Sequence, residues 1–284
     1  MNKEEVKRIL LENNVSVKKQ YGQNFLLDEN VLNNIVTNAN INKNSFVIEI
    51  GPGLGFLTNY LSKYANNVLC YEIDSEMVDV IKSRNYTNVD IEYKDFLKAN
   101  VNEDIKKYNT KNLEVVVVAN LPYYITTPIL LKILEETSSV DRMVVMMQKE
   151  VALRICGKPS TKDYNCLSVL IQYFTNPKYL FTVKPGSFYP EPGVDSAVIE
   201  IKYKNEIENI AIDLNYFLKF NRNIFAQRRK TLMNNLQKSY SYDKQEMLNI
   251  LENKNISSNI RSEALSVDEI VELANIFYQT FEKK

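Results

Sequence analysis

Short apolar runs bounded by turn residues alternate with stretches of helical periodicity between about residues 28 and 203. Residues 115–118 are four consecutive valines, which favour a strand because β-branched side chains lose rotamer freedom in a helix. The predicted strands span 45–50, 68–73, 89–93, 114–119, 143–148, 179–183 and 197–203, and the predicted helices span 28–38, 56–63, 75–84, 128–136 and 164–174. Such alternation predicts an α/β, Rossmann-like fold: a mostly parallel sheet with helices on both faces.

After residue 205 only helical patterns follow. Ser266 with Glu269 three residues later is a capping-box signature that opens the final helix. Six apolar residues recur at helical spacing and predict two helices with one face toward a core. They are Phe217, Phe220, Ile224, Phe225, Leu232 and Leu236. We therefore expect two domains, 1–205 and 206–284, the second small and all-helical.

The sequence carries no membrane or secretory signature. Its longest apolar run, Val115–Ala119, is far shorter than the ~18 residues that a membrane helix needs. Residues 1–11 are charged and lack the apolar core of a signal peptide. We expect a cytoplasmic monomer that contacts no membrane.

The chain contains no histidine, which excludes catalytic triads and general bases built on imidazole. Its three cysteines, Cys70, Cys156 and Cys166, show no C-x-x-C spacing and lie among apolar neighbours. We expect no metal site and no redox pair.

A glycine-rich segment, Gly51–Gly55, follows the first predicted strand and precedes a helix. Glycines let a ligand approach the backbone, and Glu72, at the end of the next strand, is placed to accept both hydroxyls of a ribose. Phe56 stands where a dinucleotide site has its third glycine, and where a phosphate-binding loop continues with Gly-Lys. An adenosyl ligand without phosphate fits better, and Glu49 suits its ammonium and sulfonium charges. A glycine turn without ligand is the alternative.

The strand 114–119 runs into Asn120-Leu121-Pro122-Tyr123. The carboxyl ends of parallel strands line the ligand crevice, and such a loop suits methylation of an adenine amine. The Asn120 side-chain oxygen and the Leu121 carbonyl can each accept one N–H, which returns the lone pair to the nitrogen for attack. Tyr123 offers a face for base stacking, worth ~1–3 kcal/mol. A turn in which Pro122 ends the strand is the alternative.

Asp95 follows the third predicted strand. It comes after the glycine segment and Glu72 in the chain, which suits a carboxylate that accepts a hydrogen bond from the adenine amine of the cofactor. The alternative, an aspartate that merely ends a strand in a loop, is common.

Charge is balanced overall, with 35 basic and 35 acidic residues, but not locally. Residues 214–242 contain no Asp or Glu and six basic residues: Lys219, Arg222, Arg228, Arg229, Lys230 and Lys238. A structural face would normally intersperse acids, whereas an RNA backbone relieves the repulsion. We hypothesise that Arg222, Arg228, Arg229 and Lys230 dock on RNA; a solvated helix face is the alternative.

These residues belong to longer segments by which the chain resembles the KsgA/RsmA ribosomal RNA adenine dimethyltransferases. The segments span nearly the whole chain in the expected order. They read Lys-Lys-Gln-Tyr-Gly-Gln-Asn-Phe-Leu at 18–26, Glu-Ile-Gly-Pro-Gly-Leu-Gly at 49–55, Asn-Leu-Pro-Tyr-Tyr-Ile-Thr-Thr-Pro at 120–128, Gln-Lys-Glu-Val-Ala at 148–152, Phe-Tyr-Pro-Glu-Pro-Gly-Val-Asp-Ser-Ala-Val at 188–198 and Phe-Ala-Gln-Arg-Arg-Lys-Thr-Leu at 225–232.

The resemblance implies S-adenosylmethionine as cofactor, S-adenosylhomocysteine as product, and two methyl groups on N6 of each of two adjacent adenines. These adenines lie near the 3′ end of 16S ribosomal RNA in the assembling small subunit. Phe188 would stack on the target base opposite Tyr123. Gly193 departs from the family, where a lysine is usual. The implied cofactor contacts are Asn24, Leu26, Gly51, Gly53, Glu72, Ile73, Asp95, Phe96 and Asn120.

Three alternatives stay open at this stage. An Erm-type enzyme that methylates large-subunit RNA shares the catalytic pattern, although the residues of segments 21–26 and 123–128 favour KsgA. A non-catalytic ribosome-assembly factor could keep the same fold, which the intact Asn120–Tyr123 argues against. At the level of residues, Phe188 could instead pack in the core, and Lys18 and Lys19 could be solvated rather than contact RNA.

Overall fold

The computed structural model describes residues 3–137 and 139–283. The chain divides into two compact units. The sheet unit comprises the chain up to Ala152 together with Lys178–Tyr203, and the helical unit comprises Leu153–Pro177 and Lys204 onward. The chain therefore enters the helical unit twice.

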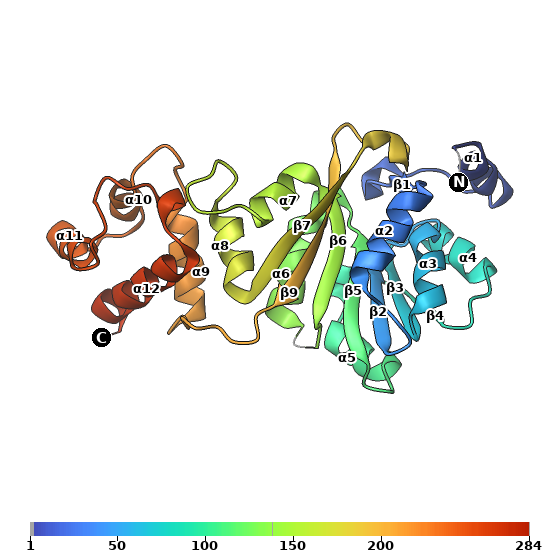
Figure 1. Ribbon diagram of the computed structural model, residues 1–284, viewed down its shortest axis with the longest axis horizontal. Helices are drawn as coiled ribbons and strands as arrows, with labels where there is room; N and C mark the ends of the chain where they lie inside the picture. Colours follow the sequence, from blue (N-terminus) through green and yellow to red (C-terminus); the bar gives the residue numbers. More distant parts are fainter. Residues whose placement is uncertain (1–2, 138, 284) are drawn as a thin grey trace. The chain divides into compact units, whose positions relative to one another are not determined.

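A seven-stranded mixed sheet forms the centre of the sheet unit (Figure 1). Its strand order is β4-β3-β2-β5-β6-β9-β7; the first five strands are parallel to their neighbours, and β6 and β9 are antiparallel. The strands are β2 (Ser45–Ile50), β3 (Asn67–Glu72), β4 (Val89–Tyr93), β5 (Glu114–Asn120), β6 (Arg142–Gln148), β7 (Thr175–Val183) and β9 (Ser196–Tyr203). A separate antiparallel pair joins β1 (Phe25–Leu26) to β8 (Phe188–Tyr189).

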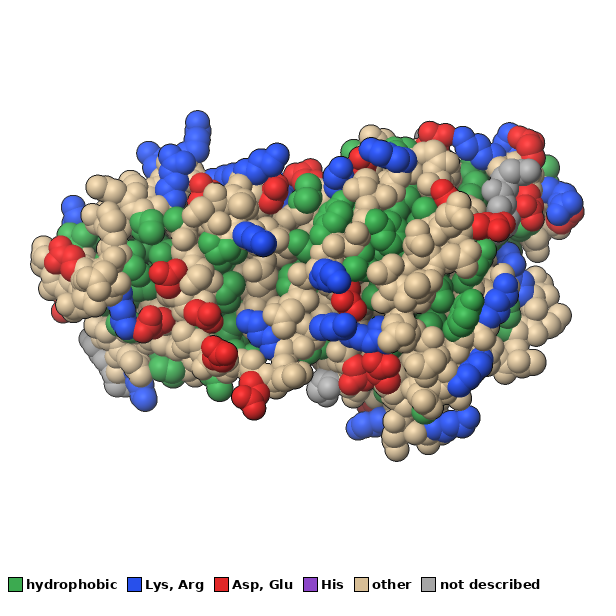
Figure 2. All heavy atoms as spheres, viewed as in Figure 1, with side chains coloured by type: hydrophobic (Ala, Val, Ile, Leu, Met, Phe, Trp, Pro, Cys, Tyr) green, Lys and Arg blue, Asp and Glu red, His purple; other side chains and the backbone are tan. Residues whose placement is uncertain are grey.

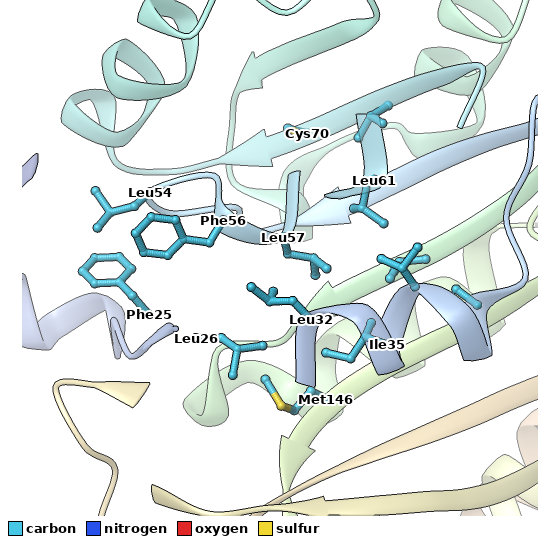
Figure 3. Close-up of a cluster of buried hydrophobic side chains, with 14 of the residues drawn as sticks. Phe25, Leu26, Leu32, Ile35, Leu54, Phe56, Leu57, Leu61, Cys70 and Met146 are labelled. Atoms are coloured by element: carbon cyan, nitrogen blue, oxygen red, sulfur yellow. The ribbon is translucent and has the colours of Figure 1, made fainter. Parts of the chain in front are cut away.

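Helices cover both faces of the sheet, as predicted. Alternate strand residues point to opposite faces, and Val47, Val68 and Val116 pack with α2 and α3 in one buried cluster. Figure 3 shows Leu32 and Ile35 of α2 and Leu57 of α3 pointing into this cluster. The helices of the sheet unit are α1 (Lys3–Glu12), α2 (Glu29–Ala39), α3 (Phe56–Tyr64), α4 (Ser75–Ser83), α5 (Val101–Tyr108), α6 (Thr126–Glu136) and α7 (Lys149–Ile155), the last of which runs into the helical unit.

The opposite face is covered by α5 and α6. Tyr71 points away from the first cluster, and its hydroxyl donates to Asp104 of α5 at 3.0 Å. Tyr203 of β9 donates to the carbonyl of Ile133 in α6 at 3.3 Å. The two layers of helices leave the strands buried on both faces, which explains their nearly continuous apolar sequences.

The helical unit has its own core. Its helices are α8 (Cys166–Phe174), α9 (Leu214–Ile224), α10 (Leu232–Ser239), α11 (Lys244–Asn253) and α12 (Val267–Phe277). The two helices predicted from the apolar stripe are α9 and α10; five of the six stripe residues are fully buried and Phe225 packs against them. The predicted capping box of Ser266 and Glu269 opens α12.

The predicted division at residue 205 differs from the structure in one respect. Residues 153–177 group with the C-terminal helices, because α8 buries Val169 and Tyr173 against them. The ring of Tyr173 lies 4.8 Å from that of Phe217. The pattern of apolar residues could not reveal this, since α8 looks like any other helix between two strands.

Element boundaries also shifted. Strand β7 begins at Thr175 rather than at 179 and includes Pro177, which an edge strand tolerates. The two-residue strands β1 and β8 and the helices α5 and α7 are not among the elements predicted from the sequence. In the part of the chain that the structure describes, no helix is both long and apolar enough to cross a bilayer.

Candidate active site

A cavity of about 280 Å³ opens at the carboxyl ends of the parallel strands. The chain runs from β2 toward one edge of the sheet and from β5 toward the other, so these strands flank the switch point where α/β proteins bind ligands. The segments after β2, β3, β4 and β5 all reach the cavity. It is lined by every predicted cofactor contact, Asn24, Leu26, Gly51, Gly53, Glu72, Ile73, Asp95, Phe96 and Asn120, and by Leu121 and Tyr123.

The glycine segment adopts a conformation that other residues rarely take. Gly51, Gly53 and Gly55 have φ of 67°, 56° and 74°. A Cβ on Gly53 would lie 3.0 Å from the ring of Phe25, so the turn is pressed against strand β1. Glycine at this position therefore serves both the left-handed turn and the close approach of the Phe25 ring.

Glu72 closes the glycine turn. Its Oε2 accepts the Gly53 N–H at 3.0 Å, and its Oε1 accepts the Ile73 and Asp74 N–H groups at 2.8 and 2.9 Å. Burial raises the pKa of Glu72, and the three backbone donors oppose that shift. A carboxylate oxygen can accept two hydrogen bonds, so Oε2 keeps one lone pair for a ligand hydroxyl.

Glu49 lies beneath the glycine turn and is 2% exposed. Burial raises its pKa to about 8, although the Thr58 hydroxyl, which donates to Oε2 at 2.6 Å, partly opposes the shift. The side chain lines the cavity. It is therefore a nearly neutral carboxyl group that a bound cation would favour in its charged form.

Asn120 ends β5 with its side chain in the cavity wall. Its Nδ2 donates to the backbone carbonyl of Asn24 at 3.2 Å. Its Oδ1 is buried and has no hydrogen-bond partner among the described residues. A buried acceptor without a donor is costly and marks a place where a ligand donor fits.

Asp95 caps a short 3-10 helix, Phe96–Lys98, with Oδ1 accepting the Leu97 N–H at 3.0 Å. Phe96 is buried and its ring meets that of Tyr71 edge to face. Both residues line the cavity at its β4 side. Their predicted contact with the cofactor adenine stays a prediction.

Tyrosines form the mouth of the site. Tyr123 is half-buried and its hydroxyl is hydrogen-bonded to Ser196. Tyr124 is 55% exposed and also lines the cavity, as does Tyr21. Of these three tyrosines, the sequence analysis predicted only Tyr123 as a site residue. Tyr21 and Tyr124 lie in the family-like segments 18–26 and 120–128, and this is the signal that could have identified them.

Phe188 does not line the cavity. It is fully buried in the apolar cluster beneath the site, where β8 pairs it with Leu26. In this structure the Phe188 ring packs in the core, and the stacking role expected for Phe188 stays a prediction. Its position in a Pro-rich loop was compatible with both.

The predicted RNA-docking residues lie in the helical unit. Arg222 is exposed near the end of α9, and Arg228, Arg229 and Lys230 are exposed in the loop before α10. Arg228 donates to Glu263 at 3.2 Å, an acid that is distant in sequence. Figure 2 shows Lys and Arg side chains projecting over α8 and α10 with single acidic side chains beside them.

The loop also borders a second cavity, of about 300 Å³, within the helical unit. Arg228 and Lys230 line it together with Lys162 and Arg154. Arg154 at the end of α7 and Lys162 in the loop before α8 thus add to the cationic character predicted for residues 214–242.

The strand order, the glycine turn with its acid, and the Asn-Leu-Pro-Tyr segment at the end of β5 define a Rossmann-like methyltransferase. Residues 14–279 match the model of the family described as ribosomal RNA adenine dimethylase. A relative from Bacillus cytotoxicus, named ribosomal RNA small subunit methyltransferase A, is 46% identical over 265 residues, 92% of this chain and 91% of that protein. A protein of the same name from Oceanobacillus iheyensis is 40% identical over 277 residues, 96% and 94% of the two chains. The chain belongs to the ribosomal RNA adenine dimethylase family.

Solved structures agree with the fold. A dimethyladenosine transferase from Plasmodium falciparum aligns with a TM-score of 0.76 at 24% identity, covering 90% of this chain and 98% of that one. The 23S rRNA methyltransferase ErmE aligns with a TM-score of 0.67 at 22% identity, covering 88% and 98%. The predicted fold class is thereby confirmed. The family model and the named relatives confirm the predicted family and enzyme class: the chain is a ribosomal RNA adenine dimethyltransferase.

Replacing Glu72 should distinguish its contribution to cofactor binding from its contribution to stability. Glu72→Ala removes the ligand acceptor and leaves buried amides unpaired, so we expect cofactor affinity to fall at least about tenfold and stability to fall by about 1–3 kcal/mol. Glu72→Gln keeps one side-chain acceptor. It should therefore lose less stability than Glu72→Ala but show a similar fall in cofactor affinity. Calorimetry and thermal unfolding measure the two effects; unchanged affinity in both variants would remove Glu72 from the binding site.

Glu49 should give the stability a pH dependence. Its pKa rises from 4.5 when unfolded to about 8 when folded, so its stabilising proton is fully held below pH 4.5 and lost as the pH rises toward 8. Within that window each pH unit costs at most about 1.4 kcal/mol. Glu49→Gln mimics the protonated group and should flatten the profile.

Thermal unfolding of the cofactor-free protein between pH 5 and 8 tests this expectation. The absence of histidine leaves few other side chains that titrate in this range. Parallel profiles for wild type and Glu49→Gln would contradict the assignment.

Proposed function

We propose that this enzyme transfers methyl groups from S-adenosylmethionine to N6 of two adjacent adenines near the 3′ end of 16S ribosomal RNA, giving N6,N6-dimethyladenine. It acts as a monomer in the cytoplasm, on RNA within the assembling small subunit. The names of relatives at 40–46% identity support the small subunit over the large one. The observation that carries the chemistry is the buried, unpartnered Oδ1 of Asn120, at the end of β5 in the cavity wall.

The cavity residues suit the proposed cofactor. The Glu72 carboxylate has an acceptor left for a ribose hydroxyl, and the glycine turn lets a ligand approach the backbone. The Glu49 carboxyl is placed beneath it to balance positive charge. S-adenosylmethionine, when bound, supplies an electrophilic methyl group.

Asn120 acts on the target amine. The N6 lone pair of adenine is delocalised into the ring, which makes the amine a weak nucleophile. Asn120 Oδ1 accepts one amine N–H, and the Leu121 carbonyl accepts the other, so the nitrogen becomes pyramidal and its lone pair is freed. The alkylated nitrogen is cationic and loses its proton to water, so no histidine base is needed.

The helical unit docks the enzyme on RNA. Arg222, Arg228, Arg229 and Lys230 are exposed, and guanidinium groups match phosphate oxygens bidentately. The Arg228 side chain is 61% exposed, so water screens its ion pair with Glu263 and the pair is worth little; a phosphate can replace it. This leaves the methyl transfer to the sheet unit.

Methyl mapping tests the reaction. After exhaustive incubation with under-methylated small subunits and labelled cofactor, mass spectrometry should find dimethyladenine at two adjacent adenines near the 3′ end of the small-subunit RNA. Label in large-subunit RNA, or monomethyladenine alone, would contradict the proposal.

Asn120→Ala tests the role of the free acceptor. A lost preorganised hydrogen bond to the transition state costs roughly 100-fold in turnover, whereas cofactor affinity should change little because the residue acts on the amine. Single-turnover kinetics and calorimetry measure the two quantities. Turnover near that of wild type would refute the role.

Removing three arginines tests the docking surface. The variant Arg222→Ala, Arg228→Ala, Arg229→Ala should bind small subunits more weakly and flatten the plot of log affinity against log salt by about 0.7–0.9 for each lost phosphate contact. Cofactor affinity should stay unchanged. Lys244→Ala, an exposed cation on α11, is the control. A wild-type slope in the triple variant would show that these residues are only a solvated face.

A further inference from the structure

The carboxylate of Asp74 fastens residues 18–26, here called the N-terminal strap. Its Oδ1 accepts the Lys18 ammonium at 2.7 Å and its Oδ2 accepts the Gln23 side-chain amide at 2.9 Å. The Gln23 Oε1 in turn accepts the Lys18 backbone N–H at 2.7 Å. Lys18, whose side chain is 26% exposed, also pairs with Glu76 at 3.0 Å, so it closes a hydrogen-bonded loop on the start of α4.

Asp74 itself is buried and lies outside the cavity lining. It is 1% exposed and is not among the residues that line the cavity. Its backbone N–H donates to Glu72 Oε1, and its side chain caps α4 by accepting the Glu76 N–H. The strap is thus tied to the same short turn that carries the predicted ribose acceptor.

The strap leads directly to the reacting group. Asn24 follows Gln23, and its carbonyl accepts the Asn120 Nδ2 at 3.2 Å. An amide rotated by 180° would exchange oxygen and nitrogen and present donors to the donors of the adenine amine. The contact with the Asn24 carbonyl favours the one orientation that leaves Oδ1 as an acceptor in the cavity wall.

We propose that Asp74 is a positioning residue for methyl transfer, which holds the strap so that the Asn24 carbonyl fixes the Asn120 amide with Oδ1 toward the target amine. The far end of the strap is held by Phe25 against Gly53 and by the pairing of Leu26 with Phe188. Asp74 holds the near end. The proposal rests on the proposed function of Asn120.

Asp74→Asn is the sharpest variant. Asparagine can still accept the Glu76 N–H and cap the helix, but its single acceptor oxygen cannot also accept from both the Lys18 ammonium and the Gln23 amide. At saturating cofactor and subunits, we expect kcat to fall about tenfold, as small misplacements of a catalytic group do, with KM for subunits and the melting temperature little changed. Asp28→Asn is the matched control, because Asp28 caps α2 and no lysine pairs with it among the described residues.

Combining the variant with Asn120→Ala separates positioning from general damage. In the Asn120→Ala background, adding Asp74→Asn should change kcat by less than about twofold, because both residues act through the Asn120 amide. A full tenfold loss that persists in the Asn120→Ala background would overturn the proposal. So would an unchanged kcat for Asp74→Asn, or a defect confined to cofactor affinity.

The outcomes distinguish this proposal from the proposed function. Wild-type turnover in Asn120→Ala alone removes the role of Asn120, whereas slow turnover in Asn120→Ala with normal turnover in Asp74→Asn removes only the role of Asp74. If Asp74→Asn fails to fold, Lys18→Met and Gln23→Ala remove the two donors singly from partly exposed positions. Each should reproduce the loss of kcat and its dependence on Asn120; normal kcat in both would overturn the proposal.

Discussion

Three backbone amides converge on the buried carboxylate of Glu72, and the geometry of the site follows from that convergence. The bond from Gly53 holds the glycine turn against the end of β3, and the bonds from Ile73 and Asp74 shape the turn that starts α4. A carboxylate in such a dry place is costly unless its lone pairs are occupied, so the turn and the acid stabilise each other. The ligand site is the space that remains between them.

The same constraint extends to the catalytic segment through the chain before β1. Because Gly53 has no side chain, Phe25 can pack on the turn, and the two-residue pairing of β1 with β8 holds the segment there. Phe188 contributes to this packing from the buried cluster. Asn120 then meets a carbonyl whose position is set by elements far from it in sequence. The proposed role of Asn120 thus depends on backbone contacts that a list of cavity residues omits.

The sequence predicted what depends on local pattern and on strand order. Residues at the ends of β2, β3, β4 and β5 meet because parallel strands share one edge, so Gly51, Glu72, Asp95 and Asn120 could be placed together without coordinates. It failed where side-chain direction or long-range contact decides. Nothing local tells whether Phe188 points to solvent or core, and the partners of Asp74 lie about fifty residues away. Likewise the strand predicted at 179–183 begins at Thr175 and includes Pro177, which an edge strand accepts.

The double passage of the chain through the helical unit has a consequence for how such enzymes can diverge. Exchange of everything after Tyr203 by a single crossover would carry away α9 to α12 but leave α8 behind, with Val169 and Tyr173 stripped of their packing partners. An intact transplant needs two crossovers, around 153–177 and at 204. Recombination is therefore a poor route to exchange of the helical unit in this architecture, and change in that unit should accumulate by point substitution, with α8 and α9 constrained to vary in concert.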